Sequence, residues 1–307
     1  KETPVTATLS YDACYLFNGW TGDLSGTQNP KNFTVQNDMN IAADVVLNNL
    51  PAVKRVVTTV AQFKTALTAM NPGDSIEVND GSYNFSSYTI NRSGCESRPI
   101  YIYAKNSGAA ILNGSTALIF KDAKYITVKG FLFQSTGIST GIKLENCSKM
   151  RITGNTFNYT ETGSCTWIYI GDTYASPIPL RSGYNRIDHN IFDGKTQAGN
   201  YIKMDGNIDQ QTRYDTINYN WFKNNGPRAA NEKESIRVGV STLSMSSGFT
   251  LIEHNLFQDC DGDPEIISVK SCDNTVRYNT FLRCLGTVSL RHGNRSTVEG
   301  NFFFGEG

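Results

Sequence analysis

The chain has 307 residues, of which 39% are hydrophobic and 18% charged, and its 28 basic side chains balance its 28 acidic ones. This length and composition suit a globular protein with a sizeable core, and the balanced charge disfavours partners such as nucleic acid or an anionic membrane. No apolar run approaches the length that a membrane-spanning helix needs. The seven cysteines lack the paired spacings of a zinc site, and their odd number leaves at least one thiol free within a monomer.

The N-terminal residues 1–55 are rich in Asn, Gly and Asp and lack the repeat found later in the chain. They are interpreted as an N-terminal extension or cap of unknown role. Within them, Ile41, Val45 and Leu50 recur at near-helical spacing. Asp38 is a suitable N-cap, so a short helix is predicted there.

A better helix is predicted over residues 61–70, because four apolar side chains share one face: Phe63, Ala66, Leu67 and Met70. Asn-Pro-Gly at 71–73 ends it. Alternation around Asp80-Gly81 then reads as strand, turn, strand. An amphipathic helix at this point would be an N-terminal helical cap, covering the otherwise open end of a repetitive core.

An internal repeat dominates residues 56–307 and predicts their architecture. Each copy has alternating apolar residues followed by a polar residue. The next residue is usually Asn, and one more residue precedes the Phe. Successive copies start at uneven intervals, some close to one basic coil and some longer. They read ITVKGFLF (126–133), MRITGNTF (150–157), NRIDHNIF (185–192), DTINYNWF (215–222), TLIEHNLF (250–257), NTVRYNTF (274–281) and STVEGNFF (296–303).

This repeat predicts an all-β fold, a right-handed single-stranded parallel β-helix whose longer coils carry loop insertions. A column of aromatic rings is expected inside, from Phe133, Phe157, Phe192, Phe222, Phe257, Phe281 and Phe303. A ladder of amides is expected at one turn, where Asn tolerates left-handed backbone, from Asn155, Asn190, Asn220, Asn255, Asn279 and Asn301. An up-and-down antiparallel protein also alternates, but it does not require the same element at these intervals.

The final coil carries Phe302, Phe303 and Phe304 and is followed by no polar or helical cap. An exposed coil of this kind is an edge prone to association. The coil domain is therefore interpreted as incomplete at its C-terminal end. We expect that end to be covered by further chain or by another polypeptide.

Clustered charge marks the candidate site on three successive coils. Asp263 and Glu265 stand at i and i+2, so an extended strand would place both carboxylates on one face, where they repel unless a cation lies between them. Asn231 lies earlier in the chain, at a distance compatible with the coil beneath. Its carbonyl oxygen and the two carboxylates form an all-oxygen set that suits Ca²⁺. A solvated acidic loop is the alternative interpretation.

Two cations fall one coil apart beside this set. The separation of Lys270 and Arg291 in the sequence is close to one coil, so they could stack as neighbours, although ordinary surface charges are the default interpretation. Lys270 follows Glu265 at an odd spacing, which on a regular strand places the two on opposite faces. A shared site therefore requires a bend between them.

Three segments carry a resemblance to a known family: NEKESIRVGVS (231–241), PEIISVKSCDNTVRYNTF (264–281) and LRHGNR (290–295). Together with GNFFFG they resemble polysaccharide lyase family 6, which contains the alginate lyases and chondroitinase B. The similarity covers roughly 56–307, and FKTALTAMNPGDSIEVNDGSY (63–83) is similar to the family's first coil.

The resemblance implies that Asn231, Asp263 and Glu265 hold Ca²⁺, with Lys270 as the catalytic base. It implies that Arg291 is the catalytic acid, and substrate-binding roles fall to Arg237, His292 and Glu234. The guanidinium is a poor acid, so the protonic role of Arg291 stays open. The family usually has Glu where this chain has Asp263, whose side chain keeps the oxygen ligand but is one methylene shorter.

The implied function is Ca²⁺-dependent cleavage of a uronate polysaccharide, alginate above all, by β-elimination that leaves 4,5-unsaturated uronate ends. Dermatan sulfate is the alternative substrate. A pectinase-type hydrolase using Asp261 and Asp263 and a non-catalytic carbohydrate-binding β-helix are further alternatives. A polymeric substrate implies an extracytoplasmic location, periplasmic, outer-surface or secreted.

Three aromatic residues of one long coil, Trp167, Tyr169 and Tyr174, could stack on sugar rings. Packing in the core or within a loop is the alternative for them. Mannuronate or guluronate preference and endo- or exo-action are not encoded in a readable pattern.

Overall fold

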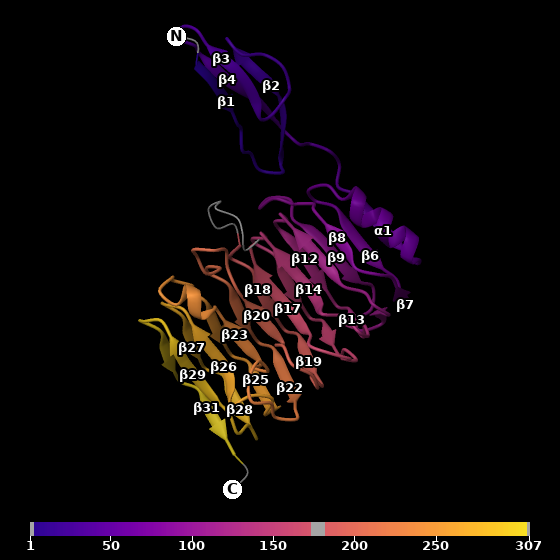
Figure 1. Cartoon of the computed structure of the whole chain (residues 1–307). Coiled ribbons are helices and arrows are strands. Elements are labelled where there is room, and N and C mark those ends of the chain that lie inside the picture. Colours follow the sequence, from indigo (N-terminus) through magenta and orange to yellow (C-terminus); the bar gives the residue numbers. More distant parts are fainter. Residues whose placement is uncertain (1–2, 173–181, 306–307) are drawn as a thin grey trace.

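The computed structural model describes residues 3–172 and 182–305. Within them, three long parallel sheets run side by side from residue 54 to residue 304 (Figure 1). The chain adds one strand to each sheet in turn, so each strand pairs with strands about one coil before and after it. The structure thus confirms a parallel β-helix and excludes an up-and-down antiparallel fold.

Each sheet collects equivalent strands of successive coils. The ten-stranded sheet contains β5 (Lys54–Val57), β6 (Ser75–Val78), β9 (Ile100–Ala104), β12 (Ile126–Lys129), β15 (Arg151–Thr153), β18 (Arg186–Asp188), β21 (Thr216–Asn218), β24 (Leu251–Glu253), β27 (Thr275–Arg277) and β30 (Thr297–Glu299). The nine-stranded sheet contains β7 (Gly81–Asn84), β10 (Ala110–Asn113), β13 (Leu132–Phe133), β16 (Thr156–Phe157), β19 (Ile191–Asp193), β22 (Trp221–Asn225), β25 (Leu256–Cys260), β28 (Thr280–Leu282) and β31 (Phe302–Phe304). The eight-stranded sheet contains β8 (Tyr88–Ile90), β11 (Leu118–Lys121), β14 (Thr140–Glu145), β17 (Thr166–Gly171), β20 (Ile202–Met204), β23 (Ile236–Val238), β26 (Glu265–Lys270) and β29 (Thr287–His292).

The predicted aromatic column fills the core. Its rings, Phe133 through Phe303, stack with centroids 4.5–4.8 Å apart and planes within 12° of parallel. This separation equals the spacing of paired strands, so one Phe per coil continues the stack without distorting the sheets. The column ends at Phe303, whose side chain is 57% exposed. Coverage of this end by further chain or another polypeptide stays a prediction.

The predicted amide ladder is also present, but its left-handed residue is not the Asn. Each Asn Oδ1 from Asn190 to Asn301 accepts both the backbone N–H and the side-chain amide of the Asn one coil earlier, at 2.9–3.0 Å. The positive φ belongs to the preceding residue, as at His189, Tyr219 and His254. The ladder therefore depends on buried hydrogen bonding rather than on the backbone tolerance of Asn.

The helix predicted over 61–70 is α1 (Val60–Ala69), and Thr59 caps it by accepting the Gln62 N–H at 3.2 Å. Its buried residues Phe63, Ala66 and Leu67 belong to the core cluster of the coils. The Phe63 ring lies edge-on to Phe85, with centroids 5.8 Å apart. A 3-10 turn, Ser241–Leu243, is the other helical element described. No helix of the described residues is long and apolar enough to cross a membrane.

The short helix predicted near Asp38 is wrong. Residues 41–47 instead form strand β4 (Ile41–Leu47), which pairs antiparallel with β2 (Tyr15–Gly22). A second antiparallel pair joins β1 (Thr3–Ala7) to β3 (Lys31–Val35). Val45 and Val46 are adjacent β-branched residues, and pairing with β2 outweighs the approximate helical spacing on which the prediction relied.

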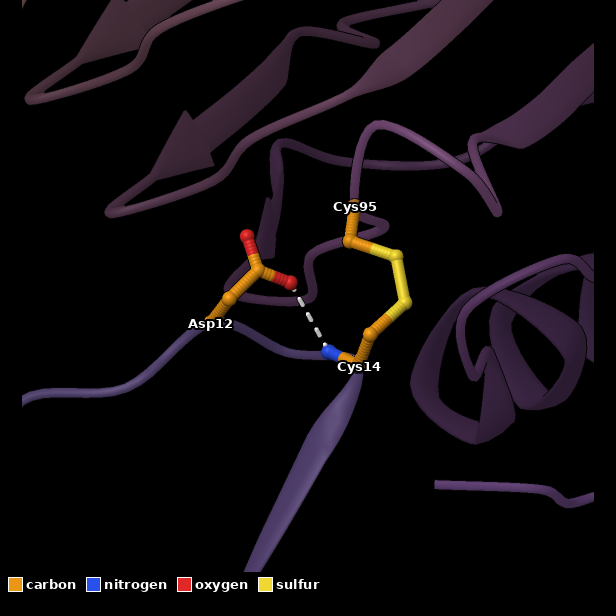
Figure 2. Close-up of side chains that lie close together, drawn as sticks. All are labelled: Asp12, Cys14 and Cys95. Atoms are coloured by element: carbon orange, nitrogen blue, oxygen red, sulfur yellow. Dashed lines mark hydrogen bonds between the residues drawn. A yellow bond between two sulfur atoms is a disulfide. The ribbon is translucent and has the colours of Figure 1, made fainter. Parts of the chain in front are cut away.

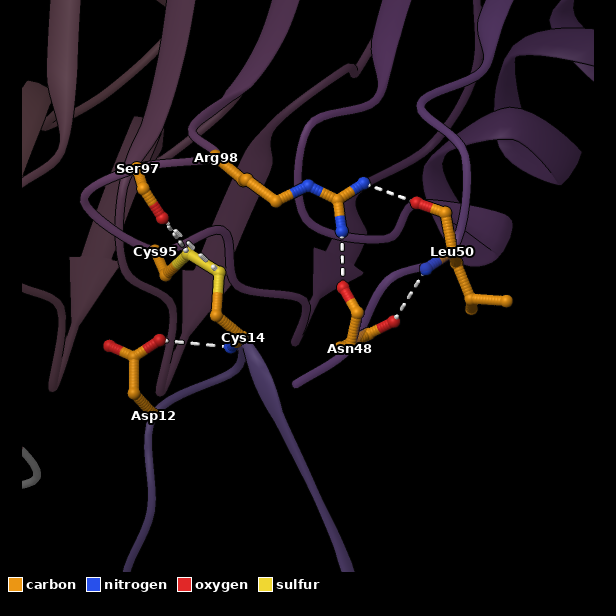
Figure 3. The surroundings of a disulfide bond; sticks show 7 residues. All are labelled: Asp12, Cys14, Asn48, Leu50, Cys95, Ser97 and Arg98. Atoms are coloured by element: carbon orange, nitrogen blue, oxygen red, sulfur yellow. Dashed lines mark hydrogen bonds between the residues drawn. A yellow bond between two sulfur atoms is a disulfide. The ribbon is translucent and has the colours of Figure 1, made fainter. Parts of the chain in front are cut away.

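The extension is fastened to the first coils by a disulfide and by an arginine (Figure 3). Cys14, just before β2, is bonded to Cys95 in the turn that precedes β9. Arg98 donates to the carbonyl oxygens of Asn48 and Leu50 from the same turn. A cross-link of this kind holds two segments together that few other contacts join. The five remaining cysteines are free.

Candidate active site

The predicted site residues gather where three neighbouring strands of the eight-stranded sheet meet, β23, β26 and β29. Glu265 opens β26 and Lys270 closes it, while Arg291 and His292 close β29. Glu234, only 2% exposed, lies just before β23. The coil-by-coil stacking thus brings residues of three successive coils onto one face.

Ion pairs connect the cations to carboxylates of the preceding coil. Lys270 Nζ lies 3.4 Å from Glu234 Oε1, and Arg291 Nη1 lies 2.7 Å from Glu265 Oε1. Glu234 is itself fixed, because Asn200 donates to its Oε2 at 2.9 Å. Lys270 and Arg291 are therefore each held by a carboxylate, and the sheet fixes where each side chain lies.

The bend that a shared site requires is present. The register of β26 against β29 shifts twice, between Glu265 and Ile267 and again between Val269 and Lys270. Bulges of this kind re-aim side chains along a strand. They place Lys270 opposite His292 rather than opposite Arg291. Glu265 and Lys270 can therefore belong to one site despite their odd spacing in the sequence.

The three carboxylates of the site influence one another. Burial raises the pKa of Asp263, and the negative charges of Glu234 and Glu265 raise it further against two backbone hydrogen bonds. Burial would also raise the pKa of Glu265, but the Ser268 hydroxyl and the Arg291 guanidinium lower it below its usual value. Shifted pKa values of this kind occur at functional sites and in structural ion-pair networks, so they make this cluster a candidate site.

Asp263 also has a structural role, because its short side chain binds two backbone N–H groups. Its Oδ1 accepts the N–H of Glu265 at 2.9 Å, and its Oδ2 accepts the N–H of Lys233 at 3.3 Å, one coil earlier. The first of these is an Asx-type turn, which Asp forms readily. Asp263 thus ties the turn that carries Glu234 to the start of β26.

The oxygen set fits a hard cation in part. Oε2 of Glu265 and Oγ of Ser268 are both buried, and the Ser268 hydroxyl stabilises the charged Glu265 carboxylate. Buried polar atoms nearly always have a partner, and Ca²⁺ takes carboxylate oxygens. Asn231 is exposed, and no hydrogen bond among the described residues joins it to Asp263 or Glu265. Its role as a ligand stays a prediction.

A row of side chains leads toward the site and adds Lys143 and Lys203, which were not predicted, to the predicted Arg237 and Tyr169. Lys143, Tyr169, Lys203 and Arg237 occupy the same register on β14, β17, β20 and β23. The two lysine ammonium groups lie 5.7 and 6.0 Å from the centre of the Tyr169 ring. Arg237 Nη2 is anchored on Asp205 Oδ1 at 3.0 Å. The signal available in the sequence was Lys-x-Glu at 143–145 repeated as Lys-x-Asp at 203–205.

The aromatic residues considered for sugar stacking occupy different environments in the structure. Trp167 is fully buried and packs edge-on against Tyr159 and Tyr201, so it belongs to the core. Tyr169 lies on the outer face between its two lysines. Tyr174 lies outside the described residues.

One further cluster has metal-like proximity but no metal-binding capacity. Figure 2 shows Asp12 beside Cys14 and Cys95, with potential ligand atoms within 4.8 Å of one another. The two sulfur atoms are joined in the disulfide, and Asp12 Oδ1 accepts the Cys14 N–H at 2.9 Å. Thiolates, not disulfides, are metal ligands, so this cluster is structural.

Comparison with known proteins agrees with this geometry. The family model described as Chondroitinase B matches residues 57–307. The chain belongs to polysaccharide lyase family 6. The family 6 alginate lyase AlyGC superposes with a TM-score of 0.70 at 28% identity, covering 82% of this chain and 35% of that one. No curated protein sequence matches the chain.

Two further family 6 structures are similar to this chain. The polysaccharide lyase Pedsa3628 from Pseudopedobacter saltans has a TM-score of 0.68 at 27% identity, covering 82% of this chain and 58% of that one. A mannuronic-acid-specific family 6 lyase from human gut microbiota has a TM-score of 0.69 at 27% identity, covering 82% of this chain and 59% of that one. The chain therefore spans between about a third and three fifths of the length of these relatives.

Proposed function

We propose that this family 6 chain carries the active site of a lyase that cleaves a uronate polysaccharide, with alginate as the preferred substrate, by β-elimination. The observation that supports this most directly is the convergence of Lys270, Arg291 and three carboxylates on adjacent strands of one sheet. The hydrolase alternative required Asp261 and Asp263 as an acid–base pair, and both carboxylates of that pair are engaged with backbone N–H groups.

The proposed reaction uses Lys270 as a neutral base and Arg291 as a positive charge in the same step. Lys270 Nζ, once unprotonated, removes the proton on carbon 5 of the uronate, and the released electron pair forms the carbon 4–carbon 5 double bond. The bond from carbon 4 to the bridging oxygen breaks, and that oxygen takes up a proton from water or from Lys270. Arg291 donates hydrogen bonds to the negative charge that develops during this step. Glu234 and Glu265 position the two side chains, since Glu234 contacts Lys270 at 3.4 Å and Glu265 contacts Arg291 at 2.7 Å.

The residues that would hold Ca²⁺ are Asp263 and Glu265, with Asn231 as a third ligand. When bound, the ion would neutralise the uronate carboxylate, on which negative charge accumulates. Oε2 of Glu265 is buried close to the negative charge of Asp263, and this proximity of two carboxylates supports the assignment. Arg237, His292 and Glu234 are proposed to contact the substrate around the same point.

Alginate is preferred because the structural relatives include an alginate lyase at 28% identity and a mannuronic-acid-specific lyase at 27% identity. Dermatan sulfate is the second candidate, because the matching family model is described as Chondroitinase B. We further propose a right-handed coil with α1 as its cap, and an extracytoplasmic location. The Cys14–Cys95 disulfide supports that location, since such bonds persist in oxidising compartments.

The test is to follow the ultraviolet absorbance of the unsaturated product on alginate and on dermatan sulfate, with and without EDTA. Lys270→Ala and Arg291→Ala should each lower kcat at least about 100-fold, the usual contribution of a general base or of an oriented charge. EDTA should lower the rate and also the melting temperature, because an ion bound only to the native state stabilises it.

Matched controls separate chemistry from fold. Lys223→Ala removes another lysine that pairs with a carboxylate one coil away, Asp193 at 3.0 Å. Arg295→Ala removes an arginine of the same coil as Arg291, paired with Asp273 at 2.7 Å. Both variants should retain the rate. A Lys270→Ala chain that is folded and cleaves at the normal rate refutes the assignment of the base.

A further inference from the structure

A hollow of about 730 Å³ lies on a different face from the candidate active site. Its walls come from β6, β9, β12 and β15 of the ten-stranded sheet, at the end of the coils that carries α1 (Figure 1). The candidate active site lies on β23, β26 and β29 of the eight-stranded sheet. The two regions are therefore separated by sheet and by several coils.

The lining of this hollow is cationic although the protein has no net charge. It includes Lys105, Lys129 and Arg151 and contains no carboxylate. Lys105 and Lys129 are exposed, and neither forms an ion pair with any described residue. Arg151 is held by Asp188 through two hydrogen bonds, of 2.8 and 2.6 Å. Two ammonium groups without a direct ion pair therefore face a partly enclosed space, although the charge of Lys105 also acts on Glu77, which accepts the Tyr103 hydroxyl at 3.1 Å.

The strand register arranges aromatic, cationic and hydroxyl groups in two rows. Tyr101 pairs with Thr127, which pairs with Arg151 on the next strand. Two positions further along, Tyr103 pairs with Lys129. Neighbouring strands lie about 4.8 Å apart, so both rows are dense. Tyr101 is 47% exposed, which leaves its ring face open to a ligand.

We propose that this hollow, the basic groove of Tyr101, Tyr103, Lys105, Lys129 and Arg151, binds a stretch of acidic polysaccharide without cleaving it. Flat tyrosine faces suit the apolar faces of sugar rings, and the hydroxyls and ammonium groups suit sugar hydroxyls and carboxylates. The lining has no carboxylate or Ca²⁺ ligand set, so it offers no counterpart of the candidate active site. The choice of a uronate polymer rests on the proposed function, whereas the groove itself requires an anionic glycan.

Binding is measured by retardation in native gels cast with increasing alginate. The parent for this test is the Lys270→Ala/Arg291→Ala chain, which leaves the polymer intact and lacks both active-site cations. Adding Tyr101→Ala, Lys105→Ala and Lys129→Ala should weaken the apparent affinity at least about tenfold, since one ring and two charges are lost. Circular dichroism and melting confirm that the variants are folded.

The matched control is Lys124→Ala, which removes an exposed lysine of the same coil as Lys129 that lies outside the groove. It should leave retardation unchanged. Equal retardation of parent and groove variant overturns the proposal, as does an equal loss in the Lys124→Ala chain or stronger capture of a single-stranded oligonucleotide than of alginate. If the native chain shows no lyase activity but the groove variant still loses retardation, the groove is supported and the proposed function fails.

Discussion

Asp215 offers the sharpest test of how the coils tolerate charge. It lies just before β21 at a position where the preceding coil has Asn185 and the two following coils have Thr250 and Asn274, and its carboxylate is buried. Its Oδ1 accepts the N–H and the amide of Asn185 at 2.8 and 2.9 Å, and its Oδ2 accepts the Thr212 hydroxyl at 2.7 Å. Burial nevertheless raises the pKa of Asp215 to about 6, against those hydrogen bonds.

The raised pKa means that the native state binds this proton more tightly than the unfolded chain does. The stability of the protein should therefore fall as pH rises from about 4 to about 6, and stay level above that. One pKa unit corresponds to about 1.4 kcal/mol, so the ionised native carboxylate costs about 3 kcal/mol. Asp215→Asn keeps the acceptor for Asn185 and places an amide beside Thr212, whose hydroxyl can accept from it.

We therefore expect Asp215→Asn to raise the melting temperature at pH 8, on the order of 5 °C for about 3 kcal/mol. The advantage should disappear near pH 4, where the native carboxyl is protonated in the unmodified chain. Thermal unfolding followed by circular dichroism across this pH range measures both quantities. A variant that is no more stable than the parent at pH 8, or whose difference from it is independent of pH, refutes the reasoning.

Asp188 is the matched control with the opposite sign. Burial would raise the pKa of Asp188, but hydrogen bonds from Arg151 and His189 lower it below its usual value. Its contribution to stability is therefore present at neutral pH and lost as pH falls through the lowered native pKa. Asp188→Asn should destabilise the chain at pH 8, where Asp215→Asn stabilises it.

Three further predictions concern the core, each measured by urea unfolding. Phe192→Ala interrupts the ring column and should cost about 3–5 kcal/mol of unfolding free energy, because the stacked neighbours cannot close the gap. Asn220→Ala leaves buried ladder N–H groups unpaired and should cost at least about 2 kcal/mol, whereas exposed Asn158→Ala should change stability by less than about 0.5 kcal/mol. In the native chain Lys195 Nζ lies 2.6 Å from the buried Glu161 carboxylate. Lys195→Met leaves that carboxylate without its cation and should cost about 3–5 kcal/mol of unfolding free energy. Adding Glu161→Gln should recover much of this loss. An Asn158→Ala loss as large as that of Asn220→Ala contradicts the role given to the ladder.

The architecture of the coils could be predicted because their interactions repeat. Each coil contacts only its neighbours, so one inward Phe and one turn Asn per coil identify strand order and core together, as at Phe192 and Asn190. The same regularity predicts that Lys270 and Arg291 lie on adjacent coils, since their separation in the sequence approximates one coil. Periodicity in this protein is thus direct information about contacts.

The features that only the tertiary structure determines lie where the repeat is interrupted. Two register shifts set the position of Lys270, one with the extra residue Ile266 in β26 and one with the extra residue Arg291 in β29, and no periodic pattern encodes them. Residues 41–47, predicted as part of a helix, form strand β4 because they pair with β2. Cys14 forms a disulfide with Cys95, 81 residues away in the sequence. Local spacing constrains a backbone weakly, whereas pairing, burial and the resulting charges are properties of segments brought together by the fold.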